Sequence, residues 1–152
     1  MRLSLILGVL LATGACSDGN DDDDLSYNCA DETRDDEFVL GLTKPGESSR
    51  YEFKLVSSDP APPARIDNRF VLELNTMAAP VTPVAGAELS VIPFMPDHAH
   101  GSGDPVVVTP MTEAGRYELY PVNLWMPGLW EVTMQVKGAQ SDRAVFRFCL
   151  PN

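Results

Sequence analysis

Apolar and polar residues alternate along most of the chain after residue 36, and this alternation predicts β-strands. The stretch GLWEVTMQV, residues 128–136, has the clearest period of two, with Trp130, Val132, Met134 and Val136 on one face and polar residues between them. A period of two places successive side chains on opposite faces of an extended strand. Shorter versions of the pattern predict further strands at residues 37–42, 49–58, 68–75, 87–94, 104–111, 115–120 and 143–149.

Turn-forming residues separate these stretches, and no segment shows sustained helical periodicity. The 13 prolines and 11 glycines of the 152-residue chain disfavour helices. Seven or eight short strands at this spacing predict an all-β fold, an immunoglobulin-like antiparallel β-sandwich. Pro93 and Pro110 are expected at sheet edges or strand ends, because proline cannot donate a hydrogen bond to a neighbouring strand.

The first 15 residues have the layout of an export signal. Arg2 supplies a positive charge, residues 3–12 are continuously apolar, and small residues follow at 13–15. An apolar run of about ten residues is too short to cross a bilayer as a helix. We therefore expect residues 1–15 to be removed on export.

Cys16 follows the small residues directly, as in the lipobox of bacterial lipoprotein signals, which this segment resembles. The resemblance implies that Cys16 carries lipid and anchors the protein to a membrane. Thr13 stands where such signals usually carry leucine, so an ordinary secretory signal stays an alternative. Ser17, next in the chain, implies sorting to the periplasmic face of the outer membrane.

Two further cysteines, Cys29 and Cys149, flank the predicted sandwich. If Cys16 is lipidated, these two remain as a pair, and in an oxidising compartment we expect a disulfide between them. Two free buried thiols are the alternative.

The segment between Cys16 and the strands is polar, with four consecutive aspartates at residues 21–24. Like charges repel, so we expect residues 16–35 to form an extended tether and residues 36–152 to form one domain. An unbroken acidic run lacks the alternating spacing of a calcium loop. The formal net charge of −11 argues against nucleic acid as a ligand.

Three motifs follow one another in the second half of the domain: MPDHAHG at 95–101, EAGRYE at 113–118 and WMPGLWEVTMQV at 125–136. Together they resemble the YtkA-like family of exported domains, which is similar to FixH-type proteins. The resemblance implies an immunoglobulin-like sandwich related to small copper-binding domains of the cell envelope. Within these motifs, Trp130 is expected in the core and Tyr117 is expected to hydrogen-bond the backbone.

The two histidines of the chain, His98 and His100, are two residues apart, so in an extended chain their side chains share a face. Imidazole suits copper, zinc and nickel, and thioether selects Cu(I). Met95, Met111 and Met126 lie in loops or strand ends that a sandwich could bring to the same end, and Asp97 could orient a histidine. We therefore expect copper as the ligand, for capture or delivery.

Other interpretations of these residues remain open. The histidine segment also fits an exposed polar turn, and the protein then is a metal-free structural or interaction domain with an envelope protein as partner. The FixH-type similarity implies a role in assembling a respiratory oxidase. We expect no enzymatic activity, because no triad, nucleophile elbow or spare cysteine is visible and a catalytic zinc would need a carboxylate such as Asp97 or Asp104 beside the histidines.

Overall fold

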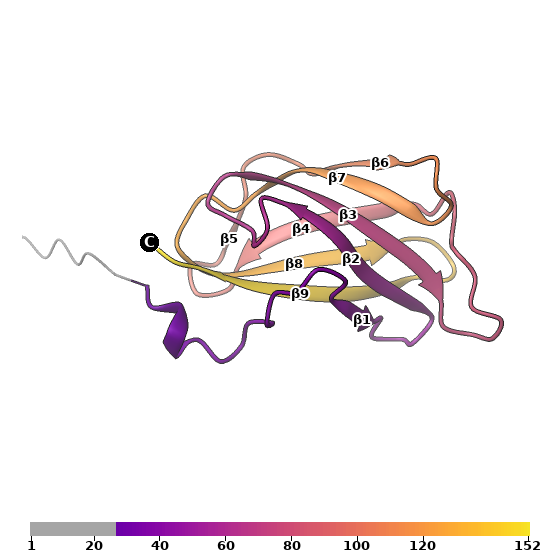
Figure 1. Ribbon diagram of the computed structural model, residues 1–152, viewed down its shortest axis with the longest axis horizontal. Coiled ribbons are helices and arrows are strands. Elements are labelled where there is room, and N and C mark those ends of the chain that lie inside the picture. The colour runs from indigo at the N-terminus through magenta and orange to yellow at the C-terminus, as the bar shows by residue number, and fades with distance from the viewer. Residues whose placement is uncertain (1–26) are drawn as a thin grey trace, which may run out of the picture.

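A computed structural model describes residues 27–152, which form two antiparallel sheets packed face to face (Figure 1). The five-stranded sheet has the order β1-β2-β3-β7-β6, and the four-stranded sheet has the order β5-β4-β8-β9. A short 3-10 turn, η1 (Cys29–Asp31), precedes the strands. The strands are β1 (Thr43–Pro45), β2 (Tyr51–Asp59), β3 (Asp67–Thr76), β4 (Leu89–Met95), β5 (His100–Gly101), β6 (Val107–Pro110), β7 (Arg116–Asn123), β8 (Gly128–Val136) and β9 (Asp142–Leu150).

The predicted all-β sandwich is confirmed, and most expected strands lie within a few residues of the observed ones. The strand expected at 37–42 is wrong, because a turn closes there with Leu42 N–H bonded to the Val39 carbonyl and Gly41 at φ +86°. β1 begins only after that turn, at Thr43. The two-residue strand β5 was not expected, since its pairing with β4 depends on the turn that joins them.

The core lies between the sheets and is built from the inward-facing residues of the alternating strands. In β8, Trp130, Val132 and Met134 are fully buried, as the period of two predicts. Tyr117 of β7 is also buried, and its hydroxyl donates to the Val84 carbonyl at 2.6 Å and accepts from the Ala87 N–H at 2.9 Å. The expected roles of Trp130 and Tyr117 are therefore confirmed.

Pro93 and Pro110, which were expected at sheet edges or strand ends, both lie where a strand lacks a full partner. Pro110 ends β6, which is one of the two outer strands of the five-stranded sheet. Pro93 lies in β4, which β5 covers only opposite Phe94 and Met95. A missing N–H costs little at such positions, so the sheets tolerate both residues.

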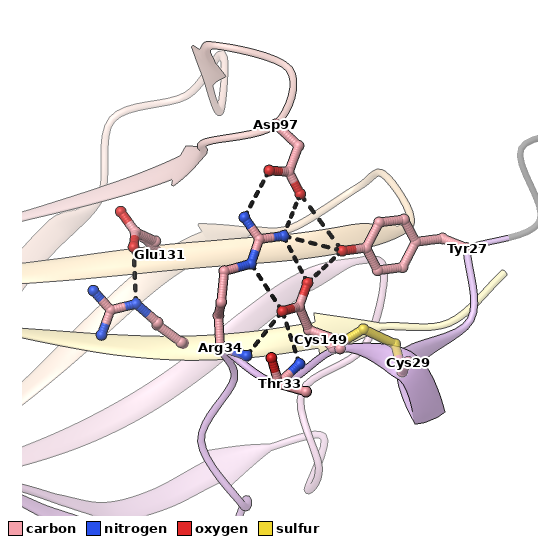
Figure 2. A network of polar contacts seen from close by, with 9 residues as sticks. Tyr27, Cys29, Thr33, Arg34, Asp97, Glu131 and Cys149 are labelled. Carbon is pink, nitrogen blue, oxygen red and sulfur yellow. Dashed lines mark hydrogen bonds and ion pairs between the residues drawn. A yellow bond between two sulfur atoms is a disulfide. The ribbon is translucent and has the colours of Figure 1, made fainter.

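The segment before β1 is attached to the domain at one end of the sandwich. Cys29 and Cys149 form a disulfide, as expected, which joins η1 to β9 (Figure 2). Residues 27–35, which the sequence places in the tether, therefore belong with the folded domain. The export signal, Cys16 and the aspartates 21–24 lie outside the described residues. Within residues 27–152, no helix has the length and apolar character needed to cross a membrane.

Candidate functional site: a histidine turn at one end of the sandwich

Both histidines lie at the hairpin between β4 and β5, at the end of the sandwich where the N-terminal segment also lies (Figure 1). β4 ends at Met95, residues 96–99 form a turn, and β5 begins at His100, which pairs with Met95. Ala99 has φ +55°, a left-handed conformation that L-residues other than glycine rarely adopt. The chain from His98 to His100 is thus a turn and not the extended segment that we expected.

The turn nevertheless brings the two imidazoles together. The ring centroids of His98 and His100 are 5.8 Å apart, and the rings are almost perpendicular at 84°. With metal–nitrogen bonds of ~2.0–2.1 Å, two imidazoles that share one ion have ring centres roughly 5–6 Å apart. His98 is exposed and His100 is half-buried. The pair therefore fits chelation of one ion from solvent.

A backbone contact orients the ring of His100. Its Nδ1 lies 3.1 Å from the Gly101 carbonyl oxygen, which can only accept, so Nδ1 carries the hydrogen of the neutral ring. The lone pair is then on Nε2. A hydrogen bond from one ring nitrogen to a backbone carbonyl is the usual way in which a protein prepares the other nitrogen for a metal.

The structure separates the three candidate methionines. Met95 is fully buried and lies directly opposite His100, so both side chains project to the inner face of the sheet. Met126 lies in the β7–β8 loop at the same end and packs against the core. Met111 follows β6 and bonds to Arg116 at the start of β7, whereas the histidine turn lies near the other end of β7. Met111 is therefore not brought to this site.

An aromatic side chain that we did not predict as part of the site stacks on His100. The Trp125 indole lies 5.9 Å from the His100 ring at an interplanar angle of 20°, and it is 49% exposed. Both rings border an open depression of about 630 Å³, which is lined by His100, Gly101, Gly103, Asp104, Asn123 and Trp125. Trp125 directly precedes Met126 in the WMPG motif, and this position is the sequence feature that could have identified it as a site residue.

Asp97 makes no hydrogen bond to the ring of either histidine, contrary to our expectation. Its carboxylate accepts two hydrogen bonds from the Arg34 guanidinium, at 2.8 Å and 2.6 Å (Figure 2). These bonds from Arg34 hold the pKa of Asp97 below its usual range. Arg34 lies 63 residues earlier in the chain, within the expected tether, and no sequence signal pointed to this pairing.

The donor set of the site is therefore two imidazoles with a thioether beside one of them on the inner face. Among residues 27–152, no three histidine, cysteine, aspartate or glutamate side chains come together as metal ligands. Two imidazoles and a thioether match the softness of copper ions better than that of calcium or magnesium, which prefer oxygen.

Comparison with protein families gives a match that includes the histidine turn. The model of the YtkA-like family matches residues 46–135, which include the histidine turn, Tyr117 and the WMPG motif. Comparison with curated proteins and with solved structures gives no match. The match covers more than half of the chain, so this protein belongs to the YtkA-like family, whose members are typically exported.

Proposed function

We propose that this exported domain binds one copper ion at the histidine turn and captures or delivers it in the cell envelope. The observation that carries the proposal is the His98–His100 ring pair, with centroids 5.8 Å apart. The Nδ1 contact of His100 supports it, because it leaves Nε2 available. The exposure of His98 supports exchange of the ion with solvent or with a partner.

The methionines favour copper as the cargo. Thioether sulfur binds Cu(I) in preference to harder ions, and the sulfur of Met95 lies on the same sheet face as the His100 ring. Met95 is fully buried and His98 is exposed, so the Met95 sulfur would reach the ion from the core side and the His98 imidazole from the solvent side. We therefore expect Cu(I) to bind more tightly than Cu(II), and Met95→Leu to weaken Cu(I) binding selectively.

The experiment is a titration of the purified protein with Cu(I), under anaerobic conditions with a competing chelator, and separately with Cu(II). We expect one ion per chain in the wild type and loss of the site in His98→Ala/His100→Ala. Binding weakens as the pH is lowered, because a ligating imidazole must be neutral. Met111→Leu, at the other end of the sandwich, is the matched control and keeps the wild-type affinity.

A second candidate function is an interaction domain that uses no metal and meets another envelope protein. Trp125 favours it, since a half-exposed indole beside an open depression is typical of a contact surface. Unchanged copper stoichiometry in the double histidine variant would favour this function over the first. No catalytic role is proposed for either arrangement.

We also propose that lipid on Cys16 anchors the protein at the periplasmic face of the outer membrane. The chain enters the domain at Tyr27, beside the histidine turn, and the eleven residue steps from Cys16 span at most roughly 40 Å. An anchor at Cys16 would thus hold the copper site close to the membrane. The mass of the mature N-terminal peptide, compared with that of Cys16→Ser, tests the lipidation.

A further inference from the structure

Arg34 joins the N-terminal segment to the turn that carries His98. Its guanidinium donates to both carboxylate oxygens of Asp97 on one side (Figure 2). On the other side it donates to both carboxylate oxygens of Glu32, at 2.8 Å and 2.7 Å. Asp97 is directly before His98 in the chain. One arginine therefore connects a segment 63 residues away to the first proposed copper ligand.

The segment that carries Arg34 is itself held firmly. The disulfide of Cys29 attaches it to Cys149 of β9. The Tyr27 hydroxyl donates to Glu32, and its ring packs over Gly128, where an added Cβ would lie 3.5 Å from the Tyr27 ring and 3.0 Å from the Met95 methyl group. The guanidinium is thus presented to the turn by a fixed part of the molecule.

The turn needs such support. Residues 97–99 are exposed, and Ala99 has a left-handed conformation that an L-residue with a Cβ adopts only at an energetic cost. A bidentate arginine–carboxylate pair fixes orientation as well as distance, because two parallel bonds restrict rotation. Holding Asp97 therefore restricts the backbone from which the His98 ring projects.

The charges of this group do not oppose a bound cation. Arg34 contributes +1, and Glu32 and Asp97 contribute −1 each, so the three side chains sum to −1. Hydrogen bonds from Arg34 and Tyr27 hold the pKa of Glu32 well below its usual range. Glu32 therefore stays ionised and paired with Arg34 at neutral pH.

We propose that Arg34 is a positioning residue of the copper site, which orders the His98 turn by clamping Asp97 to the disulfide-bonded N-terminal segment. This inference rests on the proposed function and adds a residue to it that contacts neither the ion nor a ligand. Under this proposal, the segment at residues 27–34 helps to position the copper ligand His98.

The test compares the wild-type protein with Arg34→Gln, Arg34→Lys and Asp97→Asn. The first measurement needs no metal: backbone order parameters of His98 and Ala99 from 15N relaxation. We expect ordered values in the wild type and values below about 0.6 in Arg34→Gln and Asp97→Asn. The second is the copper affinity, which we expect to fall by about tenfold in both variants with the stoichiometry unchanged, and to recover in part in Arg34→Lys.

Arg143→Gln is the matched control. Arg143 pairs with Glu47 at 2.8 Å and is the second residue of β9, at the other end of the sandwich, so its loss should leave both measurements at wild-type values. An unchanged order parameter in Arg34→Gln overturns the clamp, and a mobile turn with wild-type copper affinity overturns the positioning role. A wild-type protein that binds no copper overturns the proposed function, while the order parameters still decide whether Arg34 orders the turn.

Discussion

At the residue scale, one buried carboxylate that backbone N–H groups surround lies far from the histidine turn. Asp142, at the start of β9, is only 5% exposed, and its carboxylate accepts hydrogen bonds from the backbone N–H groups of Ser48, Arg50, Tyr51 and Arg143. A Cβ at Gly46 would overlap this carboxylate, so glycine is required for the β1–β2 loop to close over it. One carboxylate thus organises the whole loop.

We predict that Asp142→Ala lowers the free energy of unfolding by about 3 kcal/mol, because several backbone donors lose their acceptor. Urea denaturation measures this, with the exposed Glu37→Ala as control. Burial raises the pKa of Asp142, but the four backbone N–H groups lower it more, so the net pKa is below the usual range.

The lowered pKa also gives a pH dependence with a definite sign. The stabilisation is fully present above the unfolded-state pKa of about 3.9 and is lost as the pH falls through the folded-state value. Wild-type stability should therefore decrease below about pH 4 more steeply than that of Asp142→Asn. Parallel curves for the two proteins would contradict this account.

At the scale of elements, the N-terminal segment depends on a single covalent link. The Cys29–Cys149 disulfide has a sequence separation of 120 residues and so encloses nearly the whole described domain. Closing so long a loop restricts the unfolded chain strongly in the entropic model. The link therefore stabilises the domain and keeps η1 and Arg34 near the histidine turn.

We predict that Cys29→Ser/Cys149→Ser lowers the free energy of unfolding by about 4–5 kcal/mol. Urea denaturation of the oxidised wild type and the double variant gives the difference. Adding a thiol reductant should destabilise the wild type and leave the double variant unchanged. Equal stability of the two proteins would show that the entropic account does not hold here.

At the scale of the whole molecule, the proposed copper site and the hydrogen bonds of Asp142 and Tyr117 lie at opposite ends of the sandwich. The histidine turn, the disulfide and the chain entry share one end, where Figure 2 shows Asp97, Cys29, Cys149 and Tyr27 together. Trp125 lies at the same end, because it stacks on His100. The Tyr117 hydroxyl and the loop organised by Asp142 lie towards the other end, beyond a continuous buried core. Stability and ligand binding should therefore respond separately to substitution.

Tyr117→Phe tests this separation. Loss of the hydroxyl removes two backbone hydrogen bonds, and we expect the free energy of unfolding to fall by about 1–2 kcal/mol. Copper affinity should stay within twofold of wild type, measured by the same chelator competition. A large loss of affinity would mean that the two ends are coupled through the core.

Local pattern alone was enough to predict the sandwich. The alternation in residues 128–136 identifies β8 and its buried face, because side-chain direction in a strand depends only on sequence parity. Two cysteines flanking the domain predicted the disulfide, and the ordered motifs from Met95 to Val136 identified the family. These features could be predicted because each depends on residues close together in the sequence or on the type of single residues.

The tertiary structure decided which residues belong to the candidate site. Strand order places Met95 opposite His100, leaves Met126 in the β7–β8 loop and sends Met111 to the far end. The three methionines looked equivalent in the sequence. The pairing of Arg34 with Asp97 spans 63 residues and depends on the path of a segment without regular strand periodicity. Such contacts follow from how the two sheets and the entering chain assemble in space, and no local repeat encodes that assembly.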